Sequence, residues 1–194
     1  MISEATAADY TTALLFALEA KSPGTGAHCN RVSKYALEIG RQMELSSAQL
    51  SNLKFGAMLH DVGKLRTPDH VLEKPGRLDP EELAAMRRHP TEGAGILHAL
   101  GFSFDLVSIV HTHHESYDGS GYPCGLAGDD ISIETRIISV ADTYDAITCD
   151  RCYRKGAPNA IARHEIESWS GKQFDPDVVD AFLNCHTFKN LAAA

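Results

Sequence analysis

The chain has 194 residues, 43% hydrophobic and 23% charged, a composition typical of one soluble globular domain. Its formal net charge of −8 argues against a nucleic-acid duplex as partner, because duplex binding needs many Lys and Arg side chains against the phosphates. No apolar run approaches the roughly 18 residues that span a bilayer. The five scattered cysteines indicate reduced thiols of the cytoplasm, so we expect a cytoplasmic protein with no membrane contact.

Apolar residues recur at helical spacing along most of the chain, and no stretch alternates convincingly with period two. The sequence therefore predicts an all-α fold, in which Ser46 or Ser47 caps the third helix and Asp79-Pro80 starts a later one. The expected helices cover residues 10–20, 28–43, 47–60, a stretch between 80 and 101, one that leads to 113–114, 134–148 and 176–186.

Residues 115–131 break this regularity, because they are rich in Gly and Asp and poor in aliphatic side chains. Long irregular loops inside compact domains are uncommon and usually functional. We expect this Gly-rich loop to border a pocket, with Gly119 and Gly121 adopting backbone angles that other residues avoid.

Imidazoles and carboxylates, the ligands that suit iron, manganese and their neighbours, recur on several predicted helices. Adjacent helical residues point about 100° apart, so one ion seldom accepts both members of a pair unless the pair lies at a helix end. Two such pairs predict a site wider than one ion, in which the Asp61 carboxylate bridges two metals suited to phosphodiester cleavage. The candidate ligands are His28, His60, Asp61, His89, His113, His114 and Asp142.

The same residues carry a resemblance to a known family. The run His60-Asp61-Val62-Gly63-Lys64 resembles the signature of HD-domain phosphohydrolases. The run 113–123, with a complete Gly121-Tyr122-Pro123 triplet, is similar to the segment that defines the HD-GYP subfamily. The similarity extends over about residues 22–183. We therefore divide the chain into an N-terminal helix (1–21), an HD-GYP domain (22–190) and a tail that resembles cloning-vector sequence (191–194).

The resemblance implies a helical bundle around a buried centre of two or three metals. It also implies hydrolysis of cyclic di-GMP in bacterial signalling, commonly with a receiver or sensor domain or a GGDEF-type protein as partner. Some family members carry a Glu, associated with a third metal, where this chain has Gly24. We therefore expect two divalent metals, iron or manganese, and mainly the linear dinucleotide pGpG as product.

Ligands for one metal are expected from His28, His60, Asp61 and Asp142, and for the other from Asp61, His89, His113 and His114. Lys64, one turn beyond His60, is expected to stabilise developing negative charge, the alternative being a surface lysine. Arg151 and Arg154 are candidates for clamping the other phosphate, with helix-surface salt bridges as the alternative for Arg154. Tyr122 either touches the substrate or pins the loop.

The sequence leaves two other functions open. One is an HD-GYP module of low activity that binds metal and signals through protein contacts. The other is a general HD phosphohydrolase acting on nucleotides. The complete ligand set and the complete Gly-Tyr-Pro triplet favour the cyclic di-GMP phosphodiesterase.

Overall fold

The fold is known from a computed structural model that describes residues 2–150, 155–186 and 188. These residues form helices joined by turns, with one isolated β-bridge between Ser170 and Phe174, so the predicted all-α class is confirmed. Arg151, Arg154 and the 191–194 tail lie outside the described residues. The elements are α1 (Glu4–Lys21), α2 (Thr25–Gln42), α3 (Ser47–Leu59), η1 (Val62–Arg66), α4 (Asp69–Leu72), α5 (Pro80–Met86), α6 (His89–Ala99), α7 (Phe104–Thr112), η2 (Gly128–Asp130), α8 (Ile133–Thr148), α9 (Asn159–Ser168) and α10 (Pro176–Asn184).

Local sequence signals explain where several helices begin. The Ser46 side chain accepts a hydrogen bond from the Gln49 N–H, and the Gln49 side-chain oxygen accepts one from the Ser46 N–H, a complete capping box. Asp79 and Glu82 form a second capping box ahead of α5, with Pro80 in the first turn as predicted. The Gly-rich loop is irregular as expected, apart from the short turn η2.

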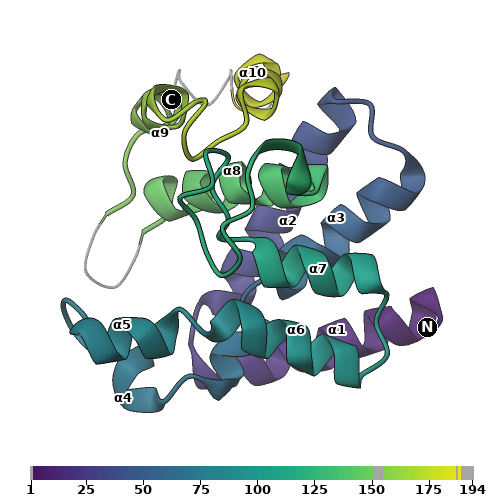
Figure 1. The fold of residues 1–194 in the computed structure, drawn as a ribbon, viewed down its shortest axis with the longest axis vertical. Helices are drawn as coiled ribbons and strands as arrows, with labels where there is room; N and C mark the ends of the chain where they lie inside the picture. The colour runs from purple at the N-terminus through teal and green to yellow at the C-terminus, as the bar shows by residue number, and fades with distance from the viewer. Residues whose placement is uncertain (1, 151–154, 187, 189–194) are drawn as a thin grey trace.

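Two hydrophobic clusters hold the helices together, and α3 contributes to both. Leu53 and Ala57 belong to a cluster with α2, α8, α9 and α10. Phe55 and Leu59 belong to a second cluster with α1, η1, α6 and α7. In Figure 1, α9 and α10 lie at the top, α1 and α6 at the bottom, and α2, α3, α7 and α8 between them. The C-terminal end of α3, which leads into His60 and Asp61, therefore lies where the two clusters meet.

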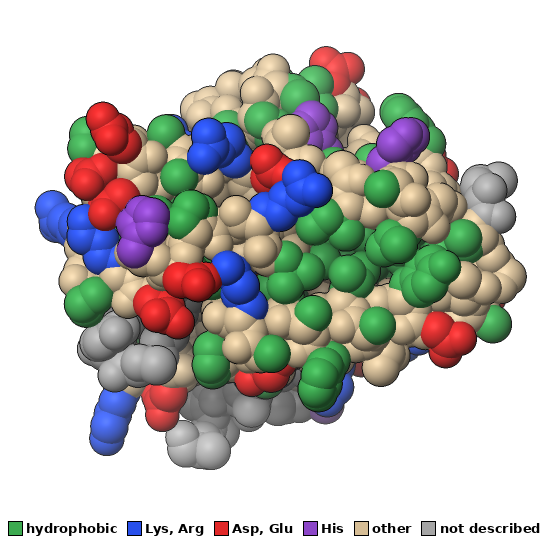
Figure 2. All heavy atoms as spheres, turned by 90° about the horizontal axis from the view of Figure 1, so that it is seen from below, with side chains coloured by type: hydrophobic (Ala, Val, Ile, Leu, Met, Phe, Trp, Pro, Cys, Tyr) green, Lys and Arg blue, Asp and Glu red, His purple; other side chains and the backbone are tan. Residues whose placement is uncertain are grey.

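The lower face of the molecule carries a group of hydrophobic side chains in the centre and right of the view in Figure 2. Most of the charged side chains on this face lie toward the left of the view. Tyr10 and Phe16 of α1 are among the large exposed hydrophobic residues, with 37% and 78% of their surface exposed. Among the described helices, none combines the length and the apolar character needed to cross a membrane.

Candidate metal centre

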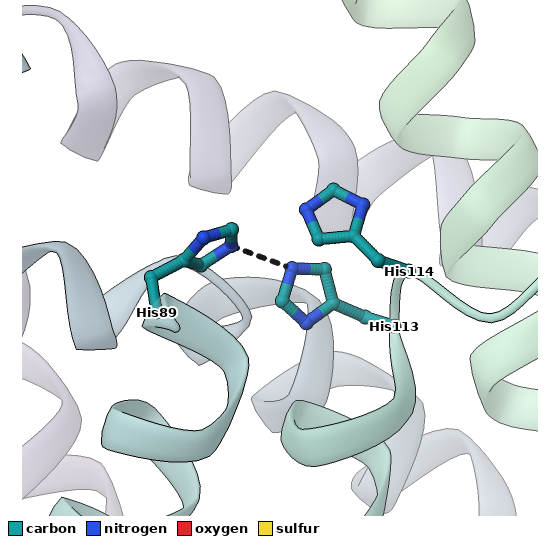
Figure 3. A group of neighbouring side chains, drawn as sticks. All are labelled: His89, His113 and His114. Atoms are coloured by element: carbon teal, nitrogen blue, oxygen red, sulfur yellow. Dashed lines mark hydrogen bonds between the residues drawn. The ribbon is translucent and has the colours of Figure 1, made fainter. Parts of the chain in front are cut away.

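The structure brings the seven predicted ligand residues into one neighbourhood. They come from the first turn of α2, the end of α3, the start of α6, the end of α7 and the middle of α8. Six of the seven contribute ligand atoms to two groups, each with all atoms within 4.8 Å of one another. One group is His89, His113 and His114 (Figure 3), and the other is His28, His60 and Asp142.

Asp61 lies between the two groups. Its Oδ1 is 3.5 Å from His89 Nε2. Its Oδ2 is 3.6 Å from His60 Nε2 and 3.9 Å from His28 Nε2. One carboxylate oxygen thus faces each group, which is the geometry of a bridging ligand.

Three of the imidazoles are fixed through Nδ1 by backbone carbonyls. The distances are 2.8 Å from His60 to Ala57 O, 2.9 Å from His89 to Met86 O and 2.7 Å from His113 to Val110 O. A carbonyl oxygen can only accept a hydrogen bond, so each Nδ1 must carry the proton. In the neutral ring, Nε2 is then a free lone pair aimed into the site, as metal-ligating histidines require.

In this arrangement the Nε2 lone pairs of His89 and His113 point toward each other. His89 Nε2 and His113 Nε2 lie 3.1 Å apart (Figure 3). Burial lowers the pKa of both imidazoles, which favours their neutral forms near pH 7. With both Nδ1 atoms protonated, neither Nε2 has a proton to share, so the contact repels unless a cation lies between them. The donors present therefore fit a divalent metal.

His28 is held by a carboxylate instead of a carbonyl. Its Nδ1 lies 2.7 Å from Asp145 Oδ2, and its Nε2 lies 3.1 Å from Asp142 Oδ1. Burial lowers the pKa of His28, but the hydrogen bonds with Asp142 and Asp145 outweigh it and raise the pKa to about 9. Arg31 donates two hydrogen bonds to the Asp145 carboxylate, from Nε to Oδ1 at 2.7 Å and from Nη2 to Oδ2 at 3.0 Å. Arg31 and Asp145 therefore orient His28 from outside the ligand groups.

Lys64 reaches the same place from η1. Its Nζ donates to Asp61 Oδ2 at 2.6 Å. Burial lowers the pKa of Lys64 and the Asp61 carboxylate raises it, with a net rise. The ammonium is therefore charged near neutral pH, and the sequence alternative of a free surface lysine does not apply.

Both adjacent pairs lie at helix ends. His60 follows the last residue of α3, and His113 follows the last residue of α7. The chain turns there, so His113 and His114 fall into the same ligand group. The exception for pairs at helix ends therefore applies, and the adjacency of two ligands does not by itself indicate two ions here. The two-metal arrangement is supported instead by the separate groups and by Asp61 between them.

Hydrogen bonds to the Glu115 side chain hold the Gly-rich loop in place. This buried carboxylate accepts hydrogen bonds from Cys124 N at 2.7 Å and Leu126 N at 3.1 Å. Gly119 has the positive φ expected, at 81°. Gly121, in contrast, does not have a positive φ. A Cβ at this position would lie 2.3 Å from Ser116 N, so the position leaves no room for a side chain. Close backbone approach explains this glycine.

Tyr122 lies over a ligand residue. Its ring stacks on His114 with centroids 4.9 Å apart and planes at 21°. Its N–H donates to the His114 carbonyl at 3.2 Å. The residue therefore orders the loop against the centre, while its contact with substrate stays a prediction.

A hollow of about 210 Å³ opens beside the centre. Ligand residues, the start of the Gly-rich loop and α8 form its wall. The lining residues are His113, His114, Glu115, Ser116, Ser139, Asp142, Thr143, Ala146 and Gln173. Metals held by the two groups would therefore be open to a ligand in this hollow.

Two residues near the centre were missed by sequence reasoning. Cys29 is fully buried, and its thiol lies within 4.8 Å of ligand atoms of His60 and Asp61. Its position next to His28 was the available signal. Arg87 lies over the Tyr122 ring, 5.1 Å from its centroid, and its place just ahead of the ligand residue His89 was the available signal.

Comparison with known proteins shows which family the chain belongs to. Residues 14–178 match the family described as HD domain. The chain belongs to the HD domain family. The resemblance read from the sequence motifs is thereby confirmed. The match begins within α1 and ends within α10, so it includes every ligand residue of the centre.

Curated relatives of this HD domain are named as phosphodiesterases. The chain is 40% identical over 169 residues to the 3'3'-cGAMP-specific phosphodiesterase 2 of Vibrio cholerae, covering 86% of this chain and 32% of the relative. It is 42% identical over 161 residues to a cyclic di-GMP phosphodiesterase of Thermotoga maritima, covering 82% and 44%. It is 40% identical over 169 residues to the cyclic di-GMP phosphodiesterase response regulator RpfG of Xanthomonas campestris, covering 86% and 45%. The matched part of this chain thus spans 32% to 45% of the length of these relatives.

Solved structures share the fold. Bd1817, an HDG"Y"P protein from Bdellovibrio bacteriovorus, has a TM-score of 0.66 at 24% identity and covers 81% of this chain and 50% of its own. The PgpH HD domain of L. monocytogenes in complex with cyclic-di-AMP has a TM-score of 0.64 at 18% identity and covers 93% and 97%. At these identities the likeness concerns the fold alone.

Proposed function

We propose that this HD domain is a metal-dependent phosphodiesterase that hydrolyses cyclic di-GMP, mainly to the linear dinucleotide pGpG, in bacterial signalling. The observation that carries the proposal is the pair of ligand groups on either side of Asp61, with histidine lone pairs turned inward. Relatives at about 40% identity named as cyclic di-GMP phosphodiesterases support the choice of substrate.

The residues fit two divalent metals, iron or manganese. His28, His60 and Asp142 would hold one, His89, His113 and His114 the other, and Asp61 both. Such a pair of ions activates water and neutralises charge on a phosphodiester. Their number and identity are part of the proposal, and metal analysis of active protein should give about two transition metals per chain.

The remaining groups have separate tasks in this proposal. Lys64 places a fixed positive charge against Asp61, where it stabilises negative charge that develops on the phosphate. Asp145 and Arg31 keep the His28 ring in one orientation. Glu115 fixes the Gly-rich loop beside the hollow that receives the substrate. Arg151 and Arg154, outside the described residues, stay candidates for binding the second phosphate.

We further propose that the protein acts in the cytoplasm, where its described cysteines, all free thiols, would stay reduced. A receiver or sensor domain and a GGDEF-type protein remain proposed partners. One relative is named a response regulator, which supports the first of these.

The test is to load metal-free protein with iron(II) or manganese(II), add cyclic di-GMP or 3'3'-cGAMP, and resolve products by chromatography. We expect cyclic di-GMP to be consumed, with linear pGpG as the main product. Preferred cleavage of 3'3'-cGAMP would reassign the substrate, as the name of one relative suggests. Metal bound with no turnover of either would favour the low-activity signalling module.

A further inference from the structure

Three side chains form a stack that leads from the metal centre to the surface. His114 belongs to a ligand group, and the Tyr122 ring stacks on it at 4.9 Å. The guanidinium of Arg87 lies over the Tyr122 ring, 5.1 Å from its centroid. Arg87 is exposed and caps the C-terminal end of α5, just ahead of His89. A cation is thus held at a fixed place beside the centre.

This cation is not neutralised by a carboxylate. Within the described ranges, no Asp or Glu lies at ion-pair distance from Arg87, whereas Arg31 and Arg136 are bound to buried carboxylates. An aromatic ring attracts a guanidinium through the ring face, so the five N–H donors are not consumed by that contact. The stack therefore fixes the guanidinium and leaves its donors available for an anion.

The charge of Arg87 and the carboxylates of the centre act on the same ring. Burial raises the pKa of Tyr122 to about 12, with Arg87 lowering it and Asp61 and Asp142 raising it. His114, at the base of the stack, also lines the hollow. The hollow of about 210 Å³ is smaller than the ~300–1,000 Å³ of common ligand sites, so a cyclic dinucleotide must extend beyond it.

We propose that Arg87 is a substrate-binding residue that holds the non-scissile phosphate of the cyclic dinucleotide while the other phosphodiester lies at the ligand groups. This inference rests on the proposed function. The planar guanidinium fork matches two phosphate oxygens, and an arginine prearranged on a ring loses less freedom on binding than a free one. Tyr122 then serves as the platform for Arg87 and need not contact the substrate itself.

The experiment compares Arg87→Ala with Arg88→Ala, which removes the same charge from the neighbouring exposed residue. Each metal-loaded variant is assayed with cyclic di-GMP and with bis(p-nitrophenyl) phosphate, which contains only a scissile phosphodiester. Arg87→Ala should raise KM for cyclic di-GMP about tenfold, with kcat, metal content and cleavage of the small diester unchanged. Arg88→Ala should match the wild type, and Arg87→Lys should fall between, because it keeps the charge without the fork.

Other outcomes would overturn the proposal. An unchanged KM in Arg87→Ala shows that Arg87 binds no substrate. Equal losses on both substrates show that Arg87 acts by holding Tyr122 and His114 in place. If the wild type cleaves the small diester but not cyclic di-GMP, the proposed function itself fails, and that result is seen before any variant is made.

Discussion

At the scale of single residues, Asp61 is the point where the two ligand groups meet. Asp61→Ala should abolish turnover of cyclic di-GMP and lower metal content, because one carboxylate oxygen faces each group. Lys64→Met should slow turnover but keep the metals, because Lys64 places a charge beside Asp61 and is not itself a metal ligand. Metal analysis and initial rates on the same preparations test both.

The exposed acid Asp9 offers a matched control, since Asp9→Ala removes a carboxylate far from the centre in sequence and should change neither quantity. Loss of metal from Lys64→Met would contradict the electrostatic role of Lys64. Metal content unchanged in Asp61→Ala would contradict a bridging carboxylate.

The two ligand groups also differ in protonation. Without metal, His28 has a pKa of about 9, so it is protonated near neutral pH, whereas burial lowers the pKa of His114 to about 4. A metal must displace the His28 proton but none from His114. Filling the group of His28 should therefore release about one proton near neutral pH and none well above pH 9.

Affinity of that group should fall about tenfold for each pH unit below the pKa of His28, since the proton competes with the metal. Calorimetric titration of metal-free protein in buffers of different ionisation enthalpy measures the protons released. Both metals binding near neutral pH with no proton release would show that His28 is already neutral.

At the scale of elements, the close contact of η1 and α6 positions Asp61 and His89 opposite one another. A Cβ on Gly63 would lie 1.8 Å from the His89 carbonyl oxygen and 2.6 Å from Gly93 N. Gly63→Ala should therefore push the two elements apart, cost about 1–3 kcal/mol of stability or more, and reduce metal content.

Gly95 of α6 is the matched control, because it is exposed and a Cβ there meets nothing within 4 Å. Gly95→Ala should stabilise the fold by about 0.5–1 kcal/mol, since alanine loses less backbone entropy in a helix. Urea unfolding of the wild type and both variants measures these changes in the free energy of unfolding. A Gly63→Ala protein as stable as the wild type would show that η1 and α6 can move apart at little cost in free energy.

Most helices could be predicted because their buried positions repeat with the helical period, as Val32, Ala36 and Ile39 do in α2. Helix α9 was missed, because only Asn159, Ala162 and Ile166 of its residues are buried, too narrow a stripe to distinguish it from a loop. The last predicted pair of helices is therefore a set of three, α8, α9 and α10. Helix α1 begins at Glu4, six residues before the predicted start, because Ser3 caps it with a hydrogen bond from Thr6 N.

The candidate ligands could be predicted because metal chemistry limits the residue types, and motif spacing selects among them. Contacts set by tertiary packing could not. The hydrogen bonds from Arg31 to Asp145 join α2 to α8, and Arg87 at the end of α5 lies over Tyr122 of the Gly-rich loop. Both contacts depend on how distant segments pack, which residue identity and local spacing do not determine.

At the scale of the whole molecule, the product of the proposed reaction should depend on how many metals the centre binds. The resemblance associates an acid at position 24 with a third metal, and this chain has Gly24 there. The nearby Glu19 carboxylate is already used, since it accepts hydrogen bonds from Gly24 N and Gly26 N at 2.8 Å each. Position 24 therefore offers no carboxylate, and the Glu19 carboxylate is already bound to the backbone at the start of α2.

Opening the ring produces a linear dinucleotide with a terminal phosphate, which carries additional negative charge. With two metals, fewer fixed positive charges face that group, so productive binding for the second cut is harder. We expect pGpG to accumulate and GMP to appear slowly, in a time course with excess cyclic di-GMP. GMP formed as fast as substrate disappears would show that the second cut is not limited in this way.

Restoring an acid gives the companion test, and the backbone decides which acid to use. Gly24 has φ of 88°, where Glu would be strained, whereas Asp and Asn tolerate this region better than most residues. Gly24→Asp and Gly24→Asn share the backbone strain and differ only in the carboxylate. Gly24→Asp should bind more metal and release GMP faster than Gly24→Asn, since a carboxylate can hold a cation that neutralises the terminal phosphate. Equal metal content and equal GMP release in the two variants would mean that an acid at this position does not control the second cut.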